Sequence, residues 1–145
     1  MIYIGVDPGK KGAFAVIDGE DVNVYPWDDL RFCIILSALP RIQCIAAVEK
    51  VGAMPGQGTV SMFNFGKSAG FIEGALTALG IPYQLIAPAT WKKEFSLIGK
   101  DKSESIAVCK HLCPGISLLP TDRCRKESDG MAEAVLMAKY AQRKL

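Results

Sequence analysis

The sequence has no apolar run of the roughly 18 uncharged residues that a membrane-spanning helix needs, and it has little net charge. Its 17 Lys and Arg residues nearly balance 15 Asp and Glu residues, leaving a formal charge of +2. This excess is too small to attract a polyanion by bulk charge. The sequence also lacks a Gly-x-x-x-x-Gly-Lys-Ser/Thr phosphate loop. Its one histidine, His111, has no recognisable Ser or Cys nucleophile as a partner.

Cysteine use gives little sign of a disulfide framework. The five cysteines are an odd number, and most lie in apolar stretches, as Cys33 and Cys44 do. We interpret them as reduced thiols. The N-terminal residues alternate like a core strand and lack the basic start of a secretory signal, so we expect an intracellular protein.

The chain has the size and composition of one domain, residues 1–145. Half of its 145 residues are apolar and 22% are charged, which is typical of a globular core. No repeat or linker divides it. Charge is nevertheless distributed unevenly, because residues 1–90 carry a net −2 and residues 91–126 a net +4.

Periodicity and turn residues predict an α/β fold with the order βββαβαβ followed by helices. Three short strands joined by tight turns form an antiparallel meander, and two further strands are parallel, giving a five-stranded mixed sheet flanked by helices. The predicted strands cover residues 2–6, 12–18, 22–25, 44–49 and 81–87. The predicted helices cover 28–39, 59–79, 91–95, 101–112 and 129–144, with Asp28, Thr59 and Ser128 as caps and Gly80 as a stop.

Two carboxylates end predicted strands. Asp7 follows the first strand and Glu49 closes the fourth. If these strands are parallel neighbours, both side chains emerge at the same end of the sheet. The alternatives are a turn-capping role for Asp7 and an ordinary exposed strand end for Glu49.

Two more carboxylates share one face of the last helix. Asp129 and Glu133 are four residues apart, and the sequence around Glu133 is apolar. Like charges at this spacing repel, and a bound cation would relieve the repulsion. Asp129 alone also suits the first turn of a helix, where the dipole favours acids.

Together, Asp7, Glu49, Asp129 and Glu133 predict a site for hard divalent ions with oxygen ligands, Mg²⁺ or Mn²⁺. Two such ions about 4 Å apart activate a water and stabilise the leaving oxygen in phosphodiester hydrolysis. No general base is then obligatory.

Four segments in this order resemble the RuvC-type Holliday junction resolvases of the ribonuclease H-like (retroviral integrase) superfamily, especially the short phage-type members and their organellar relatives. The resemblance covers almost the whole chain. The segments are Ile4-Gly5-Val6-Asp7-Pro8-Gly9 with Gly12-Ala13, Val48-Glu49, residues 88–93 followed by 100–103, and residues 129–138.

The resemblance implies a homodimeric, metal-dependent endonuclease that resolves four-way DNA junctions by paired symmetric nicks. Asp7, Glu49, Asp129 and Glu133 would be its metal ligands, and Lys102 would match a lysine near the active site. Many relatives have Asp in place of Glu133 or space the final pair by three residues. The expected location is the cytoplasm of a bacterium or of a phage-infected host cell.

A DNA substrate needs basic side chains that neutralise its phosphates. The candidates are Lys92, Lys93, Lys100 and Lys102, followed by Arg123, Arg125 and Lys126 just before the last helix. A solvated basic surface is the alternative.

Two apolar residues near the Gly- and Pro-rich loop 51–58 are candidates for contacts at the junction centre. An apolar side chain there, such as Met54 or Phe63, would wedge between base steps. For Met62, Phe63 and Phe65, which follow the loop, packing in the core is the favoured role. Small residues at every fourth position of the same helix, from Gly66 to Ala78, would allow close approach of the sheet or of a second subunit.

Three other functions remain open. The carboxylates suit a nuclease for other branched DNA or for RNA–DNA hybrids, and the basic segments suit a junction-binding protein with weak catalysis. A sugar-kinase or actin-like ATPase also opens with a similar Asp-Pro-Gly turn, but it needs two such domains.

Overall fold

A computed structural model describes residues 1–145. None of its helices combines the length and the apolar character needed to cross a bilayer. Its elements are β1 (Ile2–Asp7), β2 (Ala13–Asp18), β3 (Asp21–Pro26), α1 (Asp29–Ser37), a 3₁₀ turn η1 (Arg41–Gln43), β4 (Cys44–Glu49), α2 (Thr59–Leu79), β5 (Tyr83–Ile86), α3 (Pro88–Glu94), α4 (Lys102–Leu112) and α5 (Asp129–Lys144).

The strands form one five-stranded sheet in the order β3-β2-β1-β4-β5. Neighbours β1, β2 and β3 pair antiparallel, whereas β4 pairs parallel with both β1 and β5. The predicted fold class, a three-stranded meander extended by two parallel strands, is confirmed.

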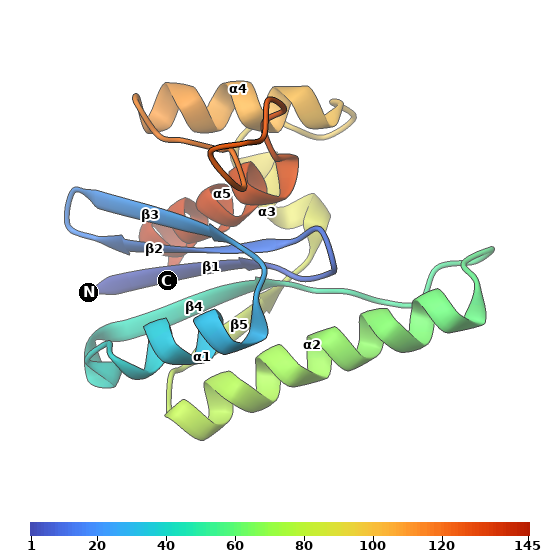
Figure 1. Ribbon diagram of the computed structural model, residues 1–145, viewed down its shortest axis with the longest axis horizontal. Helices are drawn as coiled ribbons and strands as arrows, with labels where there is room; N and C mark the ends of the chain where they lie inside the picture. Colours follow the sequence, from blue (N-terminus) through green and yellow to red (C-terminus); the bar gives the residue numbers. More distant parts are fainter.

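Helices cover both faces of this sheet, with α1 and α2 on one side and α3, α4 and α5 on the other (Figure 1). Successive side chains of β1 point alternately to the two layers of helices. Ile2, Ile4 and Val6 are buried in the core beneath α1 and α2, so the intervening residues Gly5 and Asp7 face the layer of α5.

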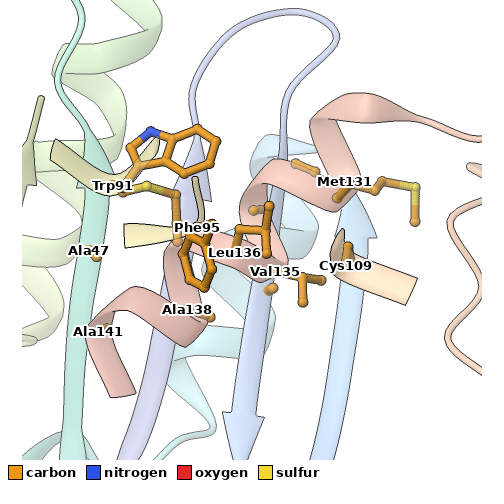
Figure 2. Close-up of a cluster of buried hydrophobic side chains, with 14 of the residues drawn as sticks. Ala47, Trp91, Phe95, Cys109, Met131, Val135, Leu136, Ala138 and Ala141 are labelled. Carbon is orange, nitrogen blue, oxygen red and sulfur yellow. The ribbon is translucent and has the colours of Figure 1, made fainter. Parts of the chain in front are cut away.

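Helix α5 lies directly on the backbone of β1. A Cβ atom at Gly5 would stand 2.1 Å from the Ala134 carbonyl oxygen and 2.2 Å from the Ala138 nitrogen, so only glycine permits this approach. The close packing builds the larger core, in which Trp91, Phe95 and Cys109 meet the apolar side of α5 (Figure 2).

Several element boundaries differ from those predicted. Gly58, not Thr59, occupies the N-cap of α2, and no side chain caps it. Helix α3 begins at Pro88 instead of residue 91, because proline suits the first position of a helix. Strand β5 begins at Tyr83 instead of residue 81, because the Ile81 amide donates to a carbonyl at the end of α2.

Helix α1 ends at Ser37, two residues earlier than predicted. The amides of Ala38 and Leu39 donate to carbonyls three residues back, which is the tighter pattern that closes a helix. The other expected caps are confirmed: Asp28 accepts from the Arg31 amide, and Gly80 is left-handed with φ 68°.

Candidate active site

Asp7 and Glu49 emerge side by side where β1 and β4 end. Val6 is paired in register with Val48, so the next residue of each parallel strand reaches the same edge of the sheet. The preceding residues, Val6 and Val48, lie in the core beneath α1 and α2. Because side chains alternate along a strand, Asp7 and Glu49 face the other side of the sheet, where α5 lies. Their predicted convergence is confirmed by the strand register.

Helix α5 brings the second pair of carboxylates to this edge. Ser128 caps the helix by accepting from the Met131 amide, and Asp129 and Glu133 occupy its first two turns. A Cβ atom at Gly130 would lie 3.2 Å from the Asp7 carboxylate and 2.3 Å from the Lys11 carbonyl oxygen. The absence of a side chain at Gly130 thus lets α5 reach Asp7.

The electrostatics show that the four carboxylates act on one another. Burial raises the pKa of Asp7 to about 8, with further increases from the charges of Glu133, Glu49 and Asp129 and an opposing effect of Lys102. Burial and Glu49 also raise the pKa of Glu133 above its ordinary value. The site concentrates negative charge that the chain's own cations leave incompletely balanced.

Lys102 is the closest cation to the cluster. Its Nζ lies 3.2 Å from Oδ2 of Asp129, and this hydrogen bond raises the pKa of Lys102. The side chain of Lys102 remains 78% exposed, so it can turn away at little cost. The structure places this lysine beside the carboxylates, where the resemblance implied it.

Trp91 donates a hydrogen bond to Glu49. Its Nε1 donates to Oε2 of Glu49 at 2.7 Å, although the indole itself is completely buried. Sequence reasoning missed this role. The available signal was an isolated tryptophan on a helix after β5, since a buried indole N–H needs a polar partner.

The donor set suits divalent cations in kind, because all four groups offer carboxylate oxygens. The raised pKa of Asp7 shows that its burial and the neighbouring carboxylates oppose its ionisation, and a bound cation would favour the ionised form. As the side chains stand, however, no three Asp, Glu, His or Cys residues are gathered closely enough to hold one ion. The ion pair to Lys102 and the hydrogen bond from Trp91 engage two of the carboxylates, Asp129 and Glu49.

Of the other predicted basic residues, Lys92 acts on the carboxylate cluster through its charge, whereas the rest form no ion pair with it. Lys92 lies over the Trp91 ring, 5.5 Å from its centroid, and its charge lowers the pKa of Glu133. The rest are exposed, and none forms an ion pair with the four carboxylates. They are Lys93 on α3, Lys100 before α4, and Arg123, Arg125 and Lys126 in the loop before α5.

Lys126 shares a cleft with Asp129, and Lys10 and Lys11 line the same cleft. Sequence reasoning gave no role to these last two lysines. Their position directly after Asp7-Pro8-Gly9 was the available signal, since residues in that turn must lie near Asp7.

The N-terminal end of α2 projects beyond the sheet (Figure 1). Phe63 lies in this end of the helix and Met54 in the loop before it, and both are exposed. Phe63 is 70% exposed and Met54 is 69% exposed. Core packing, the role favoured for Phe63 from the sequence, is therefore wrong.

Comparison with known proteins identifies the fold. No protein-family model matches the chain, and no curated protein sequence matches it. A structure of Thermus thermophilus RuvC in complex with a Holliday junction substrate aligns over 99% of this chain and 97% of that one, with a TM-score of 0.67 and 16% identity. A second T. thermophilus RuvC structure aligns over 99% and 96%, with a TM-score of 0.61 and 16% identity. The chain thus has the RuvC-type, ribonuclease H-like fold.

Proposed function

We propose that this protein is a divalent-metal-dependent endonuclease that resolves four-way DNA junctions by paired nicks. The convergence of Asp7, Glu49, Asp129 and Glu133 at one edge of a RuvC-type sheet carries the proposal. Burial and three neighbouring carboxylates raise the pKa of Asp7 to about 8. A carboxylate site for a cation has this property when no cation is bound, because mutual repulsion then opposes ionisation.

The proposed chemistry is hydrolysis of a phosphodiester. The four carboxylates would hold divalent ions, two in the proposed arrangement, and these ions would supply the Lewis acidity that activates a water and stabilises the leaving oxygen. Asp7 and Glu49 are fixed by the sheet, and Trp91 orients Glu49 through its N–H. Asp129 would hold such an ion in place of its ion pair with Lys102, and the ammonium group of Lys102 would then be available to a phosphate oxygen.

The remaining basic residues serve binding in this proposal. Lys92, Lys93 and Lys100 lie on or just after α3, and Arg123 and Arg125 lie in the loop that leads into α5. Each would neutralise a backbone phosphate without reading sequence.

In this proposal, exposed apolar residues in and just before the projecting end of α2 make the protein selective for junctions. Phe63 and Met54 would wedge between bases at the open centre of a four-way junction. A Phe63→Ala variant should then bind duplex DNA like the wild type but bind and cut junctions at least tenfold less well.

Paired cutting needs two active sites, and we propose a homodimer formed along α2. Added Cβ atoms at Gly66, Gly70 and Gly74 would meet nothing within 4 Å, so this stripe of small residues does not pack on its own sheet. The intrachain alternative for the stripe is wrong, and the proposal assigns the exposed stripe to contact with a second copy of the helix.

The proposal is tested with a labelled four-way junction, a duplex of matching sequence, a flap and an RNA–DNA hybrid. Each is incubated with the protein and Mg²⁺, Mn²⁺ or chelator. Asp7→Asn is compared with Asp18→Asn, because Asp18 is exposed at the opposite end of the sheet, paired with Ile2.

We expect symmetric paired nicks in the junction alone, abolished by chelator and by Asp7→Asn and unchanged in Asp18→Asn. If the flap or the hybrid is cut with the same dependence on metal and on Asp7, the proposed active site is correct but the proposed substrate is wrong. Nicking that survives Asp7→Asn would refute the site.

A junction-binding protein with weak catalysis is the second candidate, and one observation favours it. No three carboxylates are gathered around a single point, and Asp129 is neutralised by Lys102. Junction binding in chelator, with no cutting at any Mg²⁺ or Mn²⁺ concentration, would establish this function instead.

A further inference from the structure

A cleft of about 370 Å³ opens between the turn that joins β1 to β2 and the loop before α5. Three lysines line it, Lys10 and Lys11 from the turn and Lys126 from the loop, with Trp27 on the β3 side. Asp129 also lines it, so the cleft reaches one of the four carboxylates.

The lysines of this cleft are unpaired, whereas its acids are neutralised. Lys10, Lys11 and Lys126 are exposed and take part in none of the four ion pairs of the structure. Glu127, in contrast, lies 3.1 Å from Lys110, and Asp129 lies 3.2 Å from Lys102. Three uncompensated positive charges therefore surround one opening, which attracts an anion with several negative charges.

The backbone around these lysines is tightly constrained. Gly9 has φ 122°, and a Cβ atom at Gly12 would lie 2.0 Å from the Asp7 carbonyl oxygen. The same turn touches the first turn of α5, because a Cβ atom at Gly130 would meet the Lys11 carbonyl oxygen at 2.3 Å. The backbone of Lys10 and Lys11 is thus held at a fixed place relative to Asp7 and the first turn of α5.

The cleft continues past Lys10 and Trp27 into a second one. This neighbour, of about 390 Å³, shares both residues and reaches the polar side chains Ser61, Asn64 and Ser68 of α2. The two clefts share Lys10 and Trp27, so together they form one track from Asp129 to the N-terminal half of α2. An elongated track suits a chain of phosphates better than a single small anion.

We propose that this track, defined by Lys10, Lys11, Lys126 and Trp27, binds the sugar-phosphate backbone of the DNA strand that enters the active site. The inference rests on the proposed function and extends it. It adds Lys10 and Lys11 to the DNA contacts, on the side of the carboxylates occupied by the β1–β2 turn instead of the side of α3 and α4. Each lysine would neutralise one phosphate.

The test measures binding of a fluorescent four-way junction in chelator between 50 and 200 mM salt. Removing one lysine that neutralises a phosphate should reduce the slope of log affinity against log salt by about 0.9. We expect Lys10→Ala, Lys11→Ala and Lys126→Ala each to weaken binding about three- to tenfold at the lower salt concentrations, and the triple variant to reduce the slope by about 3.

Arg41→Ala is the matched control. Arg41 is exposed, lies in η1 at the start of β4, and forms no ion pair, so its removal should leave affinity and slope unchanged. All four replaced side chains are exposed, and circular dichroism spectra should match that of the wild type. A triple variant with the slope of Arg41→Ala would overturn the track.

Cutting is measured on the same samples with Mg²⁺, which separates the track from the proposed function. A wild type that binds with a track-dependent slope but cuts no DNA supports the track and refutes the nuclease. A wild type that cuts junctions, with slopes unchanged in the lysine variants, refutes the track alone. Absence of any DNA binding by the wild type would refute both.

Discussion

Replacing Asp7 by Asn should stabilise the metal-free protein at alkaline pH. The asparagine keeps the shape of the side chain and removes a charge that burial and three carboxylates oppose. The pKa of Asp7 rises from its ordinary value of 3.8 to about 8 in the folded protein. The unfolded chain therefore releases this proton at lower pH than the folded one, and folding stability falls as pH rises from about 4 to about 8.

The size of the effect follows from the shift. About four pKa units correspond to an upper limit of about 6 kcal/mol for ionising Asp7 in the folded state. Asp7 is only half-buried, so water and the nearby Lys102 relieve part of this cost. We expect Asp7→Asn to raise the free energy of unfolding at pH 8 by about 2 kcal/mol, or about 6 °C in melting temperature.

Thermal unfolding in chelator at pH 5 and at pH 8 measures this difference, with Asp18→Asn as the control for removal of a surface charge. The advantage of Asp7→Asn should grow from pH 5 to pH 8, because the wild-type carboxyl stays protonated at the lower pH. Mg²⁺ at about 100 times its dissociation constant should then stabilise the wild type by about 2.7 kcal/mol and Asp7→Asn by much less. A variant whose advantage is the same at both pH values would refute the reasoning.

Three further predictions concern packing, positioning and assembly. Trp91→Phe removes the N–H that binds Glu49, so half-maximal cutting should need about tenfold more Mg²⁺. Junction binding in chelator should be unchanged. An unaltered dependence of cutting on Mg²⁺ would show that Trp91 serves packing alone. Gly5→Ala should cost about 3 kcal/mol or more in urea unfolding, because its Cβ would overlap α5, and a cost below about 1 kcal/mol would contradict the direct contact of α5 with β1. Gly70→Leu should convert the proposed dimer to a monomer in analytical ultracentrifugation, and a sedimentation profile equal to that of a dimeric wild type would place the interface elsewhere.

The sheet and the carboxylates were predictable because local signals agreed with the final fold. Residues 44–49 combine a buried strand pattern with a terminal acid, and Ser128 caps α5 as its type predicts. The spacing of Asp129 and Glu133 determined their common helix face. These features depend on periodicity and capping within one segment.

What escaped prediction depends on contacts between segments far apart in the chain. The bond from Trp91 to Glu49 spans 42 residues. The cleft formed by Lys11 and Lys126 exists only because Gly130 lets α5 touch the β1–β2 turn. Similarly, the open side of Gly70 follows from how α2 lies on the sheet, which its own sequence pattern does not determine.

The central claim is that the carboxylate cluster at the ends of β1 and β4 is the metal-dependent nuclease site. The most direct measurement is the initial rate of paired junction nicking as Mg²⁺ is titrated, for the wild type, Glu49→Gln and Asp18→Asn. The account predicts saturable nicking in the wild type and Asp18→Asn and no paired nicks in Glu49→Gln, whose junction binding in chelator is retained. Nicking by Glu49→Gln at the wild-type rate and metal dependence would contradict it.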